Sequence, residues 1–156
     1  MKVHLNKLFT VFVIIYLPMA TVAQTKLAAQ RDEIVRSISE SNKIYGQAFI
    51  LNKPALFISR YSDDPCIMPA NAPTLCGKDA ANTFFKQAYV DLAIRNVVLT
   101  TQEVFGEGEY VTEKGVFELF DSDNNRIDKG KYLVLWKHTA IGWKMFRDSF
   151  GSDQKK

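Results

Sequence analysis

The fold is decided by two stretches near the end of the chain, Lys129-Gly130-Lys131-Tyr132-Leu133-Val134-Leu135-Trp136-Lys137 and Gly142-Trp143-Lys144-Met145-Phe146-Arg147-Asp148-Ser149-Phe150. Both stretches are rich in aromatic and aliphatic residues that favour extended strands. The residues that they flank, Thr139-Ala140-Ile141-Gly142, form a short connection. Two β-prone runs around so short a connection predict a long hairpin.

Two more strand-like segments precede the hairpin. The predicted strands cover residues 94–105, 110–120, 127–139 and 143–150. Residues typical of turns lie between them, with glycines at 106 and 108 and an Asp/Asn-rich stretch at 121–125. The C-terminal part of the chain therefore predicts an antiparallel meander.

The N-terminal part predicts helices. Apolar residues recur at helical spacing in a long segment, 26–51, and Pro54 can open a short helix that reaches residue 61. A turn at 62–65, a short strand at 66–69 and a third helix over 77–92 follow. Helices first and a meander last predict an α+β fold, in which the helices pack on one face of a curved, mostly antiparallel sheet.

The first residues have the pattern of a secretory signal peptide. Lys2 and Lys7 give a positive start, residues 8–17 are an apolar run, and Thr21-Val22-Ala23 supplies the small residues of a cleavage site. The apolar run is about ten residues long, well short of the roughly 20 that a membrane-spanning helix needs. We therefore expect residues 1–23 to be cleaved on export and 24–156 to form one periplasmic or extracellular domain without membrane attachment.

The charge balance excludes some partners. The chain has 20 basic and 17 acidic residues. Lys2 and Lys7 lie in the predicted leader, which contains no acidic residue, so the mature chain is close to neutral. A nearly neutral domain lacks the basic surface that binds nucleic acids or anionic lipids.

Cys66 and Cys76 are the two cysteines of the chain. In an exported protein they could form a disulfide, which would stabilise the fold by about 3 kcal/mol for a loop of this size. They could equally be small buried residues. The sequence leaves this choice open.

Three pieces of sequence carry a resemblance to a known family: Tyr61-Ser62-Asp63-Asp64 before a strand, Gly77-Lys78 before the third helix, and the aromatic hairpin. With this order of elements, the chain resembles an exported branch of the SnoaL-like, steroid-isomerase-like superfamily, which includes nuclear transport factor 2. The resemblance covers essentially all of the mature chain. It implies a cone-shaped half-barrel, a pocket between sheet and long helix, and commonly a homodimer, but no single activity.

The chain lacks most of the catalytic residues of the steroid isomerases of this superfamily. Those enzymes place a general-base carboxylate on the strand after the Asp-Asp turn, where this chain has Cys66-Ile67-Met68-Pro69-Ala70 without an acid. Tyr45 is close to the position of their first-helix tyrosine. The later strand, which carries an acid in those enzymes, offers Tyr132 and Val134 here.

Strand alternation places Glu113 on the more apolar face of its strand, with Val111 and Phe117. A carboxyl group on an inward face needs a partner, and the same alternation makes Arg147 the natural one, with Tyr132 and Trp136 beside it. Glu113 could be a general acid or base, or half of a structural ion pair. The structural interpretation is the one that we favour.

Motifs for other chemistry are missing from the sequence. His138 is the single histidine of the mature chain, and with two cysteines ten residues apart it has no usual zinc spacing. We find no phosphate-binding loop and no cofactor motif, so we expect neither a metal nor a cofactor.

Three functions stay open at this point. The first is binding of a small, partly apolar molecule in a pocket lined by aromatic residues and a few polar ones. The predicted lining is Tyr45, Tyr61, Met68, Phe84, Glu113, Phe117, Tyr132, Trp136 and Arg147. The second is an isomerase, lyase or hydrolase that uses Glu113. The third is a homodimerisation module that pairs through the outer sheet face, for which Leu133, Leu135, Phe146 and Phe150 are candidates.

Overall fold

The computed structural model describes residues 17–154. The chain divides into two parts, residues 1–32 and 33–156, and each is considered by itself. In the first part, the described residues form the beginning of helix α1 (Leu17–Ile50). Most of the predicted signal peptide lies outside the described residues. Within the described range, no helix is both long enough and apolar enough to cross a bilayer.

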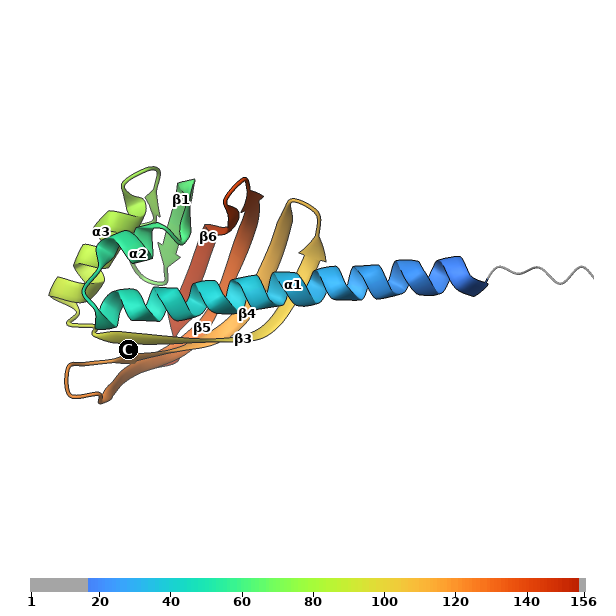
Figure 1. The fold of residues 1–156 in the computed structure, drawn as a ribbon. Coiled ribbons are helices and arrows are strands. Elements are labelled where there is room, and N and C mark those ends of the chain that lie inside the picture. Colours follow the sequence, from blue (N-terminus) through green and yellow to red (C-terminus); the bar gives the residue numbers. More distant parts are fainter. Residues whose placement is uncertain (1–16, 155–156) are drawn as a thin grey trace, which may run out of the picture. The chain divides into compact units, whose positions relative to one another are not determined.

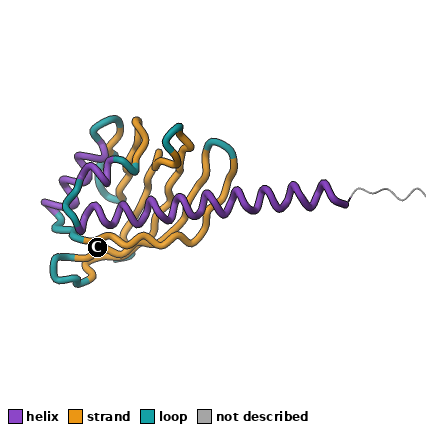
Figure 2. Tube along the Cα trace, viewed as in Figure 1, coloured by secondary structure: helices purple, strands orange, loops and turns teal. Residues whose placement is uncertain are grey.

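The second part contains the remaining helices and all strands of the described chain (Figures 1 and 2). After α1 come helix α2 (Pro54–Ile58), strand β1 (Tyr61–Pro69), strand β2 (Leu75–Cys76), helix α3 (Ala80–Lys86) and a π-helical segment, η1 (Gln87–Asp91). Four long strands follow: β3 (Asn96–Glu107), β4 (Tyr110–Phe120), β5 (Arg126–Thr139) and β6 (Gly142–Ser152).

The strands form a single six-stranded sheet in the order β2-β1-β6-β5-β4-β3. Neighbouring strands are antiparallel except β1 and β6, which are parallel. β6, the last strand that the structure describes, therefore lies between β1 and β5. The expected α+β fold, with helices packed on a curved and mostly antiparallel sheet, is confirmed.

Residues 33–50 of α1 pack on one face of the sheet because their apolar side chains repeat at helical spacing. Ile34, Ile38, Tyr45 and Phe49 are all buried and belong to the hydrophobic core. Phe57 of α2 is fully buried and contacts the rings of both Tyr45 and Phe49. Gly46 allows α1 to approach β3, since a Cβ atom there would lie 2.3 Å from the backbone oxygen of Val97.

Some boundaries differ from the sequence-based prediction. The expected turn at 62–65 is part of β1, and α2 ends at Ile58 instead of reaching Tyr61. The pairing of β1 with β6 is irregular between Tyr61 and Cys66, and this irregularity leaves Asp63 and Asp64 exposed. A turn-like composition therefore occurs within a strand, at a point where the ladder is interrupted.

A β-bulge in β6 overturns part of the predicted strand alternation. Trp136 pairs with Met145 while its neighbour Leu135 pairs with Arg147, so Phe146 is an extra residue on β6. One extra residue exchanges the two faces of everything that follows it. Met145 faces the core as predicted, but after the bulge Asp148 and Phe150 face inward and Arg147 faces outward.

Candidate functional site

A cavity of about 570 Å³ lies within residues 33–156, on the inner face of the sheet. Its walls come from α1, from the α3–η1 segment, from β3 to β6, and from the loop that joins β1 to β2. Aromatic and aliphatic side chains make up most of the lining, including Phe49, Phe84, Leu92, Leu99, Leu119 and Phe150. The volume and the apolar walls are typical of pockets that hold small molecules.

Asp148 is the buried acidic group of this cavity. Its side chain is 5 % exposed and lines the cavity near Tyr45 and Met145. The hydroxyl of Tyr61 donates to Oδ2 of Asp148 at 2.7 Å. Burial raises the pKa of Asp148 to about 6, although the Tyr61 hydrogen bond acts in the opposite direction. Asp148 therefore changes its charge close to neutral pH.

Two tyrosines extend the polar side of the cavity toward α1. Tyr45 lines the cavity and lies within hydrogen-bonding reach of Tyr61, which in turn contacts Asp148. Burial, and then the charge of Asp148, raise the pKa of both phenols above the ordinary value. Both therefore remain neutral phenols at physiological pH, as donors and acceptors of hydrogen bonds.

Glu113 lies in a second polar cluster, behind the wall of the cavity. Its carboxyl group is fully buried and accepts four hydrogen bonds. Oε1 accepts from Asn42 Nδ2 at 2.7 Å, Thr101 Oγ1 at 2.6 Å and Tyr132 OH at 2.7 Å, and Oε2 accepts from Trp136 Nε1 at 3.0 Å. We call Glu113 and these four donors the Glu113 network.

The Glu113 network connects α1 with β3, β4 and β5. Asn42 comes from the helix, and the carboxyl group and its other donors come from three adjacent strands. Gly115 makes room for the Tyr132 side chain of this network, because a Cβ atom at position 115 would lie 2.3 Å from Cζ of Tyr132. A buried carboxyl group whose partners are all supplied by the fold stabilises the structure. This arrangement favours a structural role for Glu113.

The predicted lining residues divide into two groups. Tyr45, Phe84, Phe117 and Tyr132 line the cavity. Outside the lining are Tyr61, Met68, Glu113, Trp136 and Arg147. Tyr61 still reaches the site through its hydrogen bond to Asp148, whereas Trp136 is fully buried in the Glu113 network.

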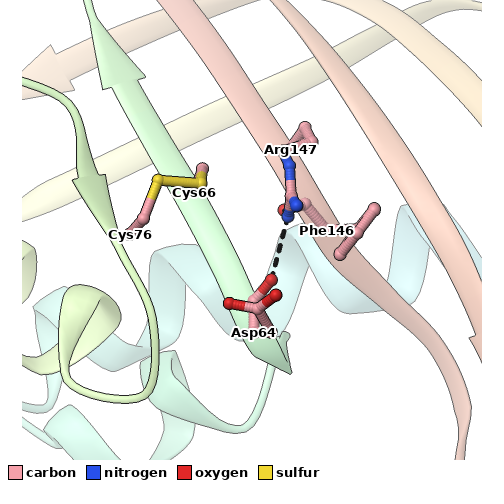
Figure 3. Close-up of a disulfide and its surroundings, with 5 residues drawn as sticks. All are labelled: Asp64, Cys66, Cys76, Phe146 and Arg147. Carbon is pink, nitrogen blue, oxygen red and sulfur yellow. Dashed lines mark hydrogen bonds between the residues drawn. A yellow bond between two sulfur atoms is a disulfide. The ribbon is translucent and has the colours of Figure 1, made fainter.

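The predicted contact between Arg147 and Glu113 is wrong. The guanidinium of Arg147 stacks over the ring of Phe146 at 3.6 Å and donates to the backbone oxygen of Asp64 at 2.9 Å (Figure 3). The bulge at Phe146 causes this, because it turns Arg147 to the outer face and Asp148 to the inner one. Asp148 and Phe150 line the cavity, although strand alternation predicts both on the opposite face.

Cys66 and Cys76 form a disulfide between β1 and β2 (Figure 3). The segment that this bond encloses includes Pro69, Ala70, Asn71 and Leu75, which line the cavity. The disulfide therefore restrains one wall of the cavity as well as the edge of the sheet.

No group of His, Cys, Asp and Glu side chains suited to a metal ion occurs among residues 17–154. His138 lies near the β5–β6 turn, where its ring packs against Trp143 with a centroid distance of 4.9 Å. His138 is not among the residues that line the cavity.

Comparisons with known proteins agree with this architecture. No family model and no curated protein sequence matches the chain. Among solved structures, an NTF2-like protein with a cystatin-like fold from Novosphingobium aromaticivorans is 18% identical, with a TM-score of 0.70, over 85% of this chain and 91% of that one. The chain has an NTF2-like fold.

Two further structures share the NTF2-like fold of this chain. A domain of unknown function with a cystatin-like fold from Nostoc punctiforme is 12% identical, with a TM-score of 0.67, over 79% of each chain. A ketosteroid isomerase-like protein from Erwinia carotovora atroseptica is 18% identical, with a TM-score of 0.61, over 77% of this chain and 96% of that one. The fold expected from the sequence resemblance is thus confirmed, while the exported branch stays a prediction.

The raised pKa of Asp148 predicts a pH-dependent stability. The pKa of Asp148 is about 6 in the folded protein and near 3.8 when the chain is unfolded. The contribution of Asp148 to the free energy of unfolding is therefore fully present below pH 3.8 and is lost as the pH rises through 6. Asp148→Asn removes the buried charge but keeps an acceptor for Tyr61. We expect the variant to be more stable than the wild type by roughly 2 kcal/mol at pH 7.5, with no gain at pH 4.

Urea denaturation at both pH values measures this effect. Asp153→Asn changes an exposed acidic residue and serves as the control, with a small effect. A stability difference between wild type and Asp148→Asn that is the same at pH 4 and 7.5 would contradict the assignment.

Proposed function

We propose that this protein binds a small, mostly apolar molecule in the cavity, with one polar group of the ligand at Asp148. The observation that carries the proposal is the cavity itself: about 570 Å³ of space lined by apolar side chains, with a single deeply buried acidic group. Preformed pockets with a few polar groups of this kind orient a ligand by those groups and bind it mainly through apolar contact.

A neutral aromatic probe tests the proposal. We expect 1-pyrenemethanol to bind saturably, as followed by its fluorescence. Leu99 lines the cavity, whereas the adjacent Val98 is 40% exposed. Leu99→Trp fills space in the cavity and should weaken binding at least about tenfold, because overpacking leaves less room for the ligand. Val98→Trp adds the same side chain elsewhere and is the matched control.

Two outcomes of this experiment count against the proposal. One is the absence of saturable binding to the wild type. The other is equal binding to Leu99→Trp and Val98→Trp, with circular dichroism showing that both variants are folded, which would place the probe outside the cavity.

A second candidate function is acid–base catalysis, with Asp148 in place of Glu113. Glu113 lies outside the cavity lining and its carboxyl group is occupied by four donors, whereas Asp148 lines the cavity and has a pKa of about 6. A group that titrates near neutral pH suits proton transfer. Such an enzyme would speed exchange of the α-protons of 2-tetralone with D₂O, as measured by NMR. Asp148→Asn should abolish the acceleration, and exchange no faster than in buffer would argue against catalysis.

A homodimer formed through the outer face of the sheet stays a prediction. Leu133 is 48% exposed and Leu135 and Phe146 are partly exposed on that face. We expect Leu135→Lys to convert a dimer into a monomer in sedimentation experiments, because an apolar contact would then contain a charge. Phe150 is no longer part of this prediction, since it lines the cavity. A wild-type protein that is monomeric at tens of micromolar would contradict it.

Export likewise stays a prediction. The disulfide is compatible with an oxidising compartment, where such bonds persist. N-terminal sequencing of the secreted protein should find Gln24 as the first residue.

A further inference from the structure

Every charged side chain that lines the cavity is acidic. Asp148 lies on the inner side and Asp128 is partly exposed, and no Lys, Arg or His of residues 17–154 is among the lining residues. We propose that the ligand of this cavity is a hydrophobic amine, whose apolar body packs against the aromatic walls and whose ammonium group binds the Asp148 carboxylate. This inference rests on the proposed binding function and names the chemical class of the ligand.

The carboxyl group of Asp148 has a vacant acceptor oxygen. Tyr61 donates to Oδ2, and no residue that the structure describes donates to Oδ1. The side chain as a whole is 95% buried, and the residue lines the cavity. Glu113 differs in this respect, since both of its oxygens accept hydrogen bonds from the protein. A ligand donor is therefore the missing partner of Asp148 and not of Glu113.

Charge favours an ammonium group over other donors. Among the residues that the structure describes, no cationic side chain forms an ion pair with Asp148. A ligand cation therefore pairs with a carboxylate whose desolvation preceded binding. A hydroxyl group would offer one neutral hydrogen bond, which is weaker than the charge-assisted bond of an ammonium. A carboxylate ligand would be repelled by Asp148. Tyr45, Phe49 and Phe84 also line the cavity, and aromatic rings can attract a cation.

We expect Asp148, and not the titratable groups that face it, to control amine binding near neutral pH. They are Tyr45 of α1, Tyr61 of β1, Glu113 of β4 and Tyr132 of β5. The three tyrosines have raised pKa values and stay neutral, and Glu113 is satisfied within its own network. Below pH 6 a proton on Asp148 must leave before the ammonium can pair with it. Amine affinity should then fall about tenfold for each pH unit.

Three probes with the same body test the inference: 1-pyrenemethylamine, 1-pyrenemethanol and 1-pyrenecarboxylate. At pH 7.5 we expect the amine to bind at least tenfold more tightly than the alcohol, and the carboxylate to bind more weakly than either. The ratio of amine to alcohol affinity should fall between pH 6 and 5. Binding of the alcohol with no advantage for the amine overturns this inference and leaves the proposed function standing. Absence of binding by all three probes overturns both.

Variants locate the ammonium group. Asp148→Asn should reduce amine affinity at least tenfold more than it reduces alcohol affinity. Asp128→Asn, the same substitution at the other lining acid, should change the amine-to-alcohol ratio less than threefold. If Asp128→Asn abolishes the advantage of the amine and Asp148→Asn does not, the assignment to Asp148 is wrong. The pH profile of the wild type decides the matter if Asp148→Asn does not fold, and a flat profile between pH 5 and 7 overturns the inference.

Discussion

Replacing Glu113 with alanine should lower the free energy of unfolding by about 4 kcal/mol, the largest effect that we expect from a single substitution in this protein. The alanine removes the acceptor of four donors: the buried Asn42 amide, Tyr132 hydroxyl and Trp136 indole, and the partly buried Thr101 hydroxyl. Each unsatisfied buried donor costs about 1–3 kcal/mol, and water that enters the vacated space recovers part of the loss. Urea denaturation measures the change.

Two other variants make the Glu113 experiment specific. Glu113→Gln keeps one acceptor oxygen in place and should cost only about 1–3 kcal/mol. Glu118→Ala removes a glutamate from the same strand whose ion pair with Arg126 is exposed, and should cost less than about 1 kcal/mol. A Glu113→Ala protein as stable as Glu118→Ala would show that the Glu113 network does not hold α1 to the sheet.

Reduction of the Cys66–Cys76 disulfide should destabilise the protein by about 3 kcal/mol, the second largest effect that we expect. Without the bond, the unfolded chain gains conformational freedom over the loop that it closed. The native β2 strand has only two residues and pairs with β1 at Cys66 and Ile67, directly beside the disulfide. Denaturation with and without dithiothreitol measures the loss.

A double variant provides the control for the disulfide experiment. Cys66→Ala with Cys76→Ala should have the stability of the reduced wild type, and dithiothreitol should not change it further. Because residues 69–73 and Leu75 also line the cavity, we expect the variant to bind 1-pyrenemethanol more weakly than the oxidised wild type. Coincident unfolding curves for reduced and oxidised wild type would contradict the prediction.

The sequence predicts most of the fold because its strands and turns have clear local signals. Alternation in β4 places Glu113 on the inner face, and the structure agrees, since β4 pairs with β5 without interruption from Tyr110 to Leu119. The position of Asn42 in the sequence also indicates a buried polar contact. Asn42 lies four residues after Ile38 and three before Tyr45, on the apolar face of α1, and a polar residue there is expected to meet a buried partner.

Regular strand alternation does not hold along β6, because a bulge depends on strand pairing and not on local composition. Nothing in Met145-Phe146-Arg147-Asp148 marks Phe146 as the extra residue. One physical signal does favour the observed face. An arginine facing inward stays charged and needs a buried partner, whereas an aspartate can accept a proton instead. Because the bulge shifts the alternation by one residue, the sequence predicts Arg147 on the inner face, where the structure has Asp148.

The position of β6 between β1 and β5 has a consequence for how the chain can fold during its synthesis. Until residues 142–152 are available, β1 has only the two-residue β2 beside it, and Tyr61 lacks its acceptor on Asp148. Tyr61 pairs with Met145, far along the chain, and such distant pairings form slowly. A nascent chain whose residues 142–152 are still inside the ribosome cannot complete the sheet. We therefore expect the sheet to be completed as one unit only after residues 142–152 have emerged from the ribosome.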